Sequence, residues 1–229
     1  MAEEKKIEII QTEDGSHSLF LPDMDETYHS SHGAIQESRH VFIKHGLDDW
    51  AAQHHADTIN ILEIGFGTGL NALLAYEWAH QHKKNVVFYT LEAYPLKEEI
   101  TTQLNYPAQM GQEDFDAPFQ QMHQCSWGTL HQLSPYFSIY KIHDKLETVS
   151  FPAVNCQLVF FDAFAPSKQE EMWALPLLEK VTDQLVNGGA LSTYCAKGQL
   201  KRDLKSLGLT VESLPGPPGK FQMVRASKA

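Results

Sequence analysis

A short buried strand, a glycine-rich turn and a helix follow one another in the stretch TINILEIGFGTGLNALLAYEWAHQH, residues 58–82. The first seven residues are mostly apolar, as in a strand of a sheet that is covered on both faces. Gly65, Gly67 and Gly69 then let the backbone pass close to a ligand, and the following helix offers free N–H groups at its N-terminus. This unit predicts an α/β fold with a ligand site at the first strand-to-helix turn.

Apolar strand segments and helical segments alternate along the rest of the chain. We expect a long helical and loop region at 96–137, further strands at 85–94, 137–144, 156–164, 190–196, 209–214 and 221–227, and helices at 69–82, 172–186 and 199–208. The last two strands are joined only by PGPPGK, which is too short for a helical crossover, so they must be antiparallel. The sequence therefore predicts a Rossmann-like, doubly wound, mostly parallel seven-stranded sheet with an antiparallel last strand.

Residues 1–55 are more polar and mixed than the segments that follow. KKIEIIQTEDGSHSLFLP predicts a β-hairpin around Asp14 and Gly15, and IQESRHVFIKHGLDDWAAQHH has apolar residues at helical spacing. We expect a small N-terminal extension, residues 1–55, packed on an α/β domain at 56–229.

Composition and charge narrow the class of protein. The start MAEEKKIEII has no apolar signal segment, and no apolar run approaches the roughly 18 residues that span a bilayer, so we expect a cytoplasmic protein without membrane contact. No obligate protein partner is evident. The net charge of −11 argues against nonspecific coating of nucleic acid. From Ala165 onward, however, nine Lys or Arg residues stand against six acidic ones, which is compatible with a locally basic face.

The spacing of the glycines indicates the ligand. A nicotinamide fingerprint requires G-x-G-x-x-G, but the sixth position from Gly65 is Leu70, and the Lys-Ser/Thr pair of a phosphate-binding loop is missing. The pattern is E-x-G-x-G-x-G, which resembles the first motif of S-adenosylmethionine-dependent methyltransferases. The resemblance implies S-adenosylmethionine as cofactor. The expected contacts in this motif are Glu63, Gly65, Phe66, Gly67, Thr68, Gly69 and Asn71.

Acidic residues at the ends of later strands extend this expected cofactor site. Glu92, followed by Ala93, ends the second strand, where the acid of dinucleotide folds accepts both ribose hydroxyls. Asp144 ends the third strand and is expected to face the adenine amino group. Tyr28 is a candidate lid over the cofactor together with Ser30, although an ordinary packed tyrosine fits the sequence equally well.

Asp162 follows four apolar residues in LVFFDAFAPSKQEEMW, at the end of the central strand. A carboxylate there suits an amine acceptor, because an alkylammonium titrates near ~10, like lysine, and must lose a proton before its nitrogen can attack. Asp162 is therefore the candidate catalytic residue beside the cofactor, placed to hold and orient the ammonium and to help its proton leave. Phe164, Pro166 and Trp173 could wall a flat ring, and Trp173 could equally be a core residue.

The same segment resembles the D-G/A-F-A/S-P-x-K-x-x-x-x-W signature of the methyltransferase half of the MnmC family of bifunctional tRNA-modification proteins. The resemblance extends over nearly the whole chain, through DETYHSSHGAIQESRHVFIKHGL, EIGFGTGLN, YKIHD, GGALSTYCAKGQLKRDLKSLG and PGPPGKFQM in this order. It implies methyl transfer from S-adenosylmethionine to the aminomethyl nitrogen of wobble 5-aminomethyl-(2-thio)uridine in tRNA. The expected step is a direct in-line displacement without a covalent enzyme intermediate.

The sequence also departs from that family. The FAD-dependent oxidoreductase half has no counterpart here, so we expect a stand-alone, MnmD-like methyltransferase without FAD and do not infer the other half's activity. Phe221 and Gln222 replace an Arg-Glu pair, and His143 replaces the glycine before Asp144. These changes leave the tRNA contacts less determined than the cofactor contacts.

Cationic residues near the expected strand ends are candidates for tRNA contact. They are Lys168, Lys197, Lys201, Arg202, Lys205 and Lys220. A phosphate-contacting rim and a solvated helix face both fit this pattern, and the tRNA resemblance favours the rim. The pairs His54-His55 and His80-x-His82 have no Cys or acid at ligand spacing, so a surface role is favoured over a metal site.

Other functions remain compatible with the sequence. A small-amine methyltransferase or a polyamine aminopropyltransferase would use the same fold, and the acidic N-terminal part suits a cationic small substrate. A non-catalytic domain that binds tRNA or a protein is the other alternative, although the intact glycines and Asp162 favour an enzyme.

Overall fold

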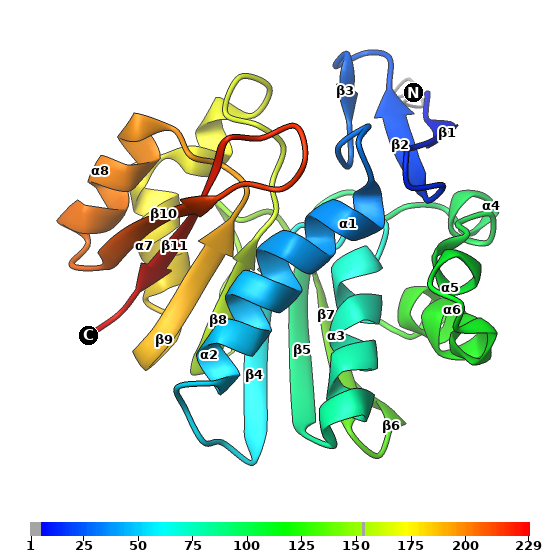
Figure 1. The fold of residues 1–229 in the computed structure, drawn as a ribbon, viewed down its shortest axis with the longest axis horizontal. Coiled ribbons are helices and arrows are strands. Elements are labelled where there is room, and N and C mark those ends of the chain that lie inside the picture. Colours follow the sequence, from blue (N-terminus) through cyan, green and yellow to red (C-terminus); the bar gives the residue numbers. More distant parts are fainter. Residues whose placement is uncertain (1–5, 153) are drawn as a thin grey trace.

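The computed structural model describes residues 6–152 and 154–229; Lys5, with which the predicted hairpin begins, lies outside the described residues. Within them, eight strands form one sheet in the order β10-β11-β9-β8-β4-β5-β7-β6 (Figure 1). The strands are β4 (Thr58–Ile64), β5 (Asn85–Glu92), β6 (Leu130–Ser134), β7 (Phe137–His143), β8 (Cys156–Phe161), β9 (Leu185–Thr193), β10 (Thr210–Pro215) and β11 (Gln222–Ser227).

The pairing confirms a doubly wound, mostly parallel sheet. β4 pairs in parallel with both β5 and β8, and the outer pairs β5–β7 and β8–β9 are parallel as well. β11 is antiparallel to β9 on one side and to β10 on the other, as the short PGPPGK link requires. The chain therefore reverses its winding direction between β4 and β8, where α/β sheets bind ligands at the carboxyl ends of the strands.

Two boundaries differ from the sequence-based expectation. Besides α4 (Glu98–Thr101), α5 (Tyr106–Gln109) and α6 (Asp116–Gln124), the region 96–137 contains β6, which pairs antiparallel with β7 as an additional edge strand. Its sequence LHQLS is polar and partly exposed, so it lacks the apolar pattern that marks the buried strands. The predicted helix 172–186 ends at Thr182, and β9 begins at Leu185, because Asn187–Gly189 lies in an irregular part of β9 rather than in a turn.

Helices cover both faces of the sheet. One continuous helical run comprises α1 (Ala34–Ser38), a π-helical segment η1 (Arg39–Asp48) and α2 (Asp49–Ala51), and it lies with α3 (Leu70–His82) in front of the sheet in Figure 1. α7 (Leu175–Thr182) and α8 (Gly198–Ser206) pack on the other face.

Side chains of the central strands alternate between these two layers. Phe160 of β8 packs against Phe42 of η1 with ring centroids 5.1 Å apart, while the next residue, Phe161, packs against Trp173 on the other face at 4.9 Å. Each such aromatic or aliphatic side chain stabilises the fold by roughly 1.5–3 kcal/mol when it is fully buried. The apolar composition of β8 follows from this two-sided cover.

The N-terminal segment forms a separate small sheet at the carboxyl ends of the large sheet's strands (Figure 1). β1 (Glu8–Gln11) and β2 (His17–Leu21) make the predicted hairpin, and β3 (Glu26–Thr27) adds to β2. Asn105 beside α5 accepts a hydrogen bond from the His17 N–H at 2.8 Å, which ties the small sheet to the α4–α6 region. No helix within residues 6–152 and 154–229 has the length and apolar character needed to cross a bilayer.

Candidate active site

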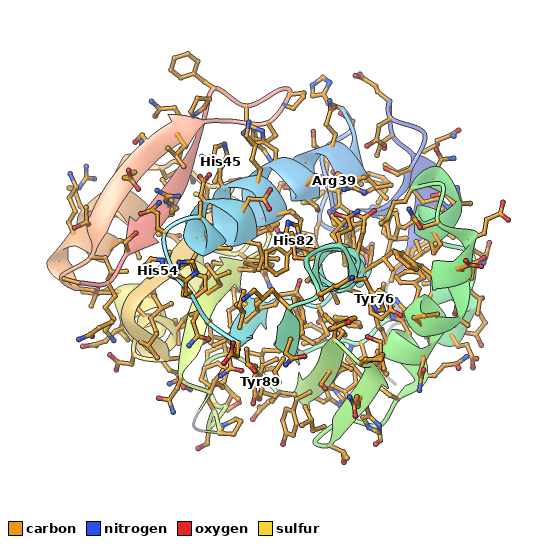
Figure 2. The ribbon with its side chains drawn as sticks, turned by 60° about the horizontal axis from the view of Figure 1, so that its bottom comes forward. Arg39, His45, His54, Tyr76, His82 and Tyr89 are labelled. Atoms are coloured by element: carbon orange, nitrogen blue, oxygen red, sulfur yellow. The ribbon has the colours of Figure 1, made fainter. Side chains whose placement is uncertain are left out.

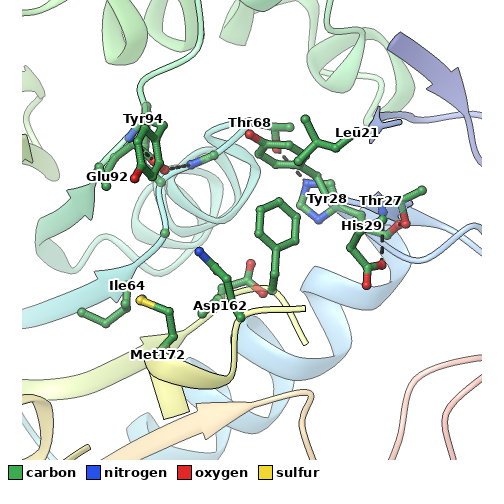
Figure 3. Close-up of a pocket in the computed structure, with 18 of the residues that line it drawn as sticks. Leu21, Thr27, Tyr28, His29, Ile64, Thr68, Glu92, Tyr94, Asp162 and Met172 are labelled. Atoms are coloured by element: carbon green, nitrogen blue, oxygen red, sulfur yellow. Dashed lines mark hydrogen bonds between the residues drawn. The ribbon is translucent and has the colours of Figure 1, made fainter. Parts of the chain in front are cut away.

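A cavity of about 1140 Å³ opens at the carboxyl ends of β4, β5 and β8 (Figure 3). Its lining comes from the glycine turn, the N-terminal segment and the segments that follow β5, β7, β8 and β9. Of the residues predicted from sequence, the lining contains Tyr28, Ser30, Gly65, Phe66, Gly67, Thr68, Asn71, Glu92, Ala93, Asp144, Asp162, Phe164 and Lys220.

The glycine turn is shaped by close backbone approaches. Gly65 has φ +96°, and a Cβ added to it would lie 2.8 Å from the backbone oxygen of Asp162. Gly67 has φ +50°, and its Cβ would lie 3.1 Å from the Tyr28 ring. Both positions need glycine, because L side chains disfavour positive φ and neighbouring segments occupy the space.

Glu92 connects the turn to the end of β5. Its carboxylate accepts a 2.9 Å hydrogen bond from the Gly67 N–H and a 2.8 Å bond from the Tyr94 N–H (Figure 3). The same side chain lines the cavity, as does Ala93. Glu92 thus lies where a hydroxyl-rich ligand would meet a fixed carboxylate.

Asp144, which follows β7, also lines the cavity and is partly exposed. Hydrogen bonds from the Thr148 hydroxyl at 2.6 Å and the Lys145 N–H at 2.7 Å hold its carboxylate and keep the pKa of Asp144 below its ordinary value. Oδ1 accepts both of these hydrogen bonds.

Asp162 follows β8 directly and faces the cavity (Figure 3). Its Oδ2 accepts a hydrogen bond from the Asn71 amide nitrogen of α3 at 2.8 Å. Burial in the cavity wall raises the pKa of Asp162 to about 7, and the nearby Glu37 carboxylate adds to the increase, while Asn71 and Lys220 oppose it. A carboxyl group in this state is a stronger base than an exposed aspartate.

Glu37 and Tyr194 are cavity residues that the sequence analysis did not identify. Glu37 of α1 is 7% exposed, accepts a 2.9 Å hydrogen bond from the Ser30 N–H and forms an ion pair with Lys220. The Lys220 ammonium lies 4.0 Å from the centroid of the Tyr194 ring, and the Tyr194 hydroxyl donates to the Ala163 oxygen at 2.7 Å. Tyr194 follows the end of β9, and this strand-end position was a usable signal; Glu37 offered none, because it lies within a helix.

The N-terminal segment closes over the glycine turn. The Tyr28 ring meets Phe164 edge-on at 5.1 Å, and a nitrogen of the His29 ring lies 2.7 Å from the Thr68 hydroxyl. Burial lowers the pKa of His29 to about 4, so its ring is neutral at physiological pH. Tyr28 and His29 therefore belong to the part of the cavity lining that the N-terminal segment supplies.

Several residues predicted from sequence lie outside the cavity lining. Glu63 is buried within β4, Gly69 is buried where the turn meets α3, and Lys197 and Lys201 lie at α8. Pro166, Lys168 and Trp173 also lie outside the cavity lining.

Trp173 packs in the core, and its indole N–H donates to the Phe164 oxygen at 2.9 Å, so it supports the wall from behind. Lys168 donates to the backbone oxygens of Met24 and Asp25 at 2.8 and 2.9 Å and ties the Asp162 segment to the N-terminal sheet.

The histidine pairs lie on different elements: His54 follows α2, and His82 ends α3; both are labelled in Figure 2. His54 stacks on Trp50 at 4.7 Å, and His82 stacks on Trp78 at 4.3 Å. Across the described part of the chain, no three His, Cys, Asp or Glu side chains come together as potential metal ligands. His54 and His82 are therefore packing partners of tryptophans, and His80 packs against Tyr76.

An antiparallel strand inserted between two parallel ones distinguishes the sheet of class I methyltransferases from a plain dinucleotide-binding sheet. β11 takes that place between β9 and β10, so the fold, with the cavity at its glycine turn, is of the class I methyltransferase type. The sequence profile of a family described as S-adenosyl-L-methionine-dependent methyltransferase matches residues 113–229, and the chain belongs to this family.

Full-length relatives place the chain more narrowly. It is 29% identical over 221 residues to the tRNA 5-methylaminomethyl-2-thiouridine biosynthesis bifunctional protein MnmC of Cupriavidus necator, covering 91% of this chain and 32% of the relative. The protein of the same name from Marinomonas sp. is 30% identical over 209 residues, with 87% and 31% covered. The chain thus spans about a third of the length of these relatives.

Solved structures agree with this placement. MNMC2 from Aquifex aeolicus superposes with a TM-score of 0.78 at 26% identity, covering 99% of this chain and 72% of that one. The CurJ carbon methyltransferase superposes with a TM-score of 0.50 at 14% identity, covering 86% and 56%, which reflects the fold alone.

Proposed function

We propose that this chain transfers a methyl group from S-adenosylmethionine to the aminomethyl nitrogen of wobble 5-aminomethyl-(2-thio)uridine in cytoplasmic tRNA. The observation that carries the proposal is the position of Asp162, a cavity carboxyl with a raised pKa beside the glycine turn and the Glu37 carboxylate. The names of the MnmC relatives support a uridine that carries a methylaminomethyl group as the product.

The cavity residues fit S-adenosylmethionine, which supplies an electrophilic methyl group when bound. Glu92 would hold the ribose hydroxyls, Asp144 would approach the adenine, and the glycine turn with Phe66, Thr68 and Asn71 would face the remaining polar parts. Apolar side chains in the same lining suit the adenine ring; they include Ile64, Leu91, Leu96, Leu146 and Met172. In this assignment Glu63 supports the turn from within β4, and Gly69 lets the turn pass into α3.

The acceptor amine would bind on the Asp162 side of the cavity. Asp162 and Glu37 offer negative charge to the ammonium, and the Tyr194 and Phe164 rings border the same space. Because its pKa is raised, Asp162 can take a proton from the ammonium more readily than an ordinary aspartate, and the freed nitrogen can then attack. Fixing both reactants in one cavity supplies most of the rate enhancement in this proposal.

Cations around the mouth would contact the tRNA phosphates. Lys197, Arg202 and Lys205 are exposed along α8, while Lys201 donates to the Gln222 side chain at 3.0 Å. We assign the phosphate contacts to the exposed cations on α8. Lys168, Lys201 and Lys220 would then support this rim through the contacts that they already make.

The direct test is methyl transfer by the purified chain. tRNA isolated from cells that lack this gene should accept labelled methyl from S-adenosylmethionine, and nucleoside mass spectrometry should show conversion of aminomethyl to methylaminomethyl uridine. tRNA that is already modified is the matched control. Absence of label on the unmodified tRNA would refute the substrate assignment.

A small-amine methyltransferase is the second candidate, because acidic residues predominate among the charged side chains of the cavity. They are Glu26, Glu37, Glu92, Asp144, Glu147, Asp162 and Glu171. The same labelled assay without tRNA, supplied with diamines and polyamines, separates the two functions. Efficient methylation of free amines alone would favour this alternative.

Phe221 gives a separate prediction about tRNA binding. It is 92% exposed, follows the cavity residue Lys220, and lies in a tight loop closed by a 3.2 Å bond from the Gly216 N–H to the Phe221 oxygen. An exposed ring on a loop next to a cavity residue suits stacking on a nucleobase, which contributes about 1–3 kcal/mol per base. Phe221→Ala should raise KM for tRNA roughly tenfold with little change in kcat.

Steady-state kinetics with tRNA checks this expectation. Leu130→Ala is the matched control, because Leu130 is also exposed, at 53%, but lies on β6 at the opposite edge of the sheet. Equal KM values for the two variants would remove Phe221 from the tRNA surface.

A further inference from the structure

Two buried oxygens beneath the glycine turn have no hydrogen-bond partner: Glu63 Oε1 and Asn71 Oδ1. Glu63 is 0% exposed and Asn71 is 3% exposed. Buried polar groups without partners are rare in folded proteins, so this pair requires a physical explanation.

Both residues belong to one series of side-chain contacts that joins β5, β4, α3 and the segment after β8. Glu63 of β4 is in register with Thr90 of β5, and the Thr90 hydroxyl donates to Glu63 Oε2 at 2.6 Å. Asn71, reaching down from α3, lies against the Glu63 carboxyl and donates from its amide nitrogen to Asp162 Oδ2 at 2.8 Å. The sequence of contacts is therefore Thr90, Glu63, Asn71, Asp162.

A single proton on Glu63 would supply the hydrogen bond that is missing from this series of contacts. A carboxylate only accepts hydrogen bonds, so an ionised Glu63 would face the Asn71 oxygen with a second acceptor. The acid form instead supplies the donor that both orphaned oxygens lack. We propose that Glu63 is a neutral carboxylic acid whose proton binds the Asn71 oxygen, so that Glu63 fixes the Asn71 amide with its nitrogen toward Asp162.

Glu63 is then a positioning residue for Asp162, an inference that rests on the proposed function of Asp162. The arrangement keeps the negative charge on the carboxyl that faces the cavity and the proton on the carboxyl that does not. If the Asn71 amide were turned over, it would donate to an ionised Glu63, and its oxygen would favour protonated Asp162. The orientation of one amide thus decides which carboxyl can attract an ammonium.

The surrounding charges agree with this distribution. Burial raises the pKa of Glu63 well above its ordinary value, and the Asp162 and Glu92 carboxylates add to the increase, while the Thr90 hydroxyl and the adjacent Asn71 side chain oppose it. Asp162 has the Lys220 charge and the Asn71 N–H to favour its ionised form. The groups that face the two carboxyls come from every neighbouring element: Glu37 (α1), Asn71 (α3), Thr90 and Glu92 (β5), Tyr194 (after β9) and Lys220 (before β11).

Infrared difference spectroscopy on the whole chain tests the proton directly. The spectrum of the wild type minus that of Glu63→Gln at pH 7.5 should contain the C=O stretch of a neutral carboxylic acid, which a carboxylate does not have. A difference spectrum that contains only carboxylate bands would overturn the proposal. This readout needs no substrate, so it stays informative even if the chain does not methylate tRNA.

The pH profile of methyl transfer tests the positioning role. Glu63→Ala frees the Asn71 amide to turn, so Asp162 loses a fixed donor and the acid limb of the kcat profile should move to higher pH. Glu63→Gln supplies an N–H in place of the acid proton and should keep the acid limb where the wild type has it. An acid limb that stays in place in Glu63→Ala would contradict the positioning role.

A matched control separates positioning from general damage to the core. Ser192 Oγ on β9 is also buried and without a partner, but lies outside this chain of contacts. Ser192→Ala should leave the acid limb in place, and thermal unfolding should show that all variants are folded. A Ser192→Ala profile shifted as far as that of Glu63→Ala would refute a specific role for Glu63.

Discussion

Asp162→Asn should transfer methyl groups at least a hundredfold more slowly than the wild type, yet unfold at a higher temperature. The loss of transfer follows because an amide neither attracts an ammonium nor takes its proton, and such groups typically contribute 10²–10⁴-fold. The gain in stability follows because burial raises the pKa of Asp162 to about 7, so folding at neutral pH disfavours its ionised form.

The sign of this effect fixes its pH range. An acid with a raised folded-state pKa stabilises the fold most below its unfolded pKa, near ~4, and this stability is lost as the pH rises toward the folded pKa. Asp162→Asn should therefore exceed the wild type in Tm above about pH 7, with a difference of roughly 2–4 °C for each kcal/mol, and match it near ~4.

Thermal scans at both pH values, calorimetry with S-adenosylmethionine and the labelled transfer assay check these outcomes together. We expect the cofactor still to bind to Asp162→Asn. Asp144→Asn is the matched control, because hydrogen bonds lower the pKa of Asp144, so its replacement should not raise Tm. Undiminished turnover of Asp162→Asn would remove the assigned role.

Gly65→Ala should have the second large effect, on stability and on activity together. A residue with a Cβ at φ +96° loses about 1–2 kcal/mol from backbone conformation alone. The added Cβ would also lie 2.8 Å from the Asp162 backbone oxygen, so the turn or the Asp162 segment must move. We therefore expect weakened cofactor binding and methyl transfer reduced at least tenfold.

Urea denaturation and cofactor calorimetry measure the two effects. Gly128→Ala is the control, since Gly128 has φ +72° but no atom within 4 Å of an added Cβ, and it should show only the conformational cost. If the two variants lost the same free energy of unfolding, the close approach at Gly65 would carry no weight.

The parts of the site that depend on local sequence were predictable. A glycine turn after an apolar strand, and acids such as Glu92 and Asp162 that end such strands, follow from short-range rules of α/β sheets, and the structure brings them to one cavity. The edge strand β6 was missed because its polar sequence LHQLS resembles a loop.

Long-range pairings were beyond the same reasoning. Glu37 and Lys220 are 183 positions apart, and nothing local marks them as an ion pair at the cavity. Trp173 illustrates the opposite case, because its place in the signature suggested a pocket wall whereas its ring is buried in the core. Whether a large apolar side chain faces a ligand or the interior is decided by packing that a single sequence does not reveal.

The place of β11 within the sheet bears on how the chain folds during synthesis. Residues 222–227 leave the ribosome after every other described strand, yet they must enter between β9 and β10. Until then one edge of β9 is unpaired and β10 has no partner. The sheet therefore cannot be completed by adding strands in the order of the chain. Such non-local pairing slows folding, and the unpaired edge is a site where nascent chains can associate.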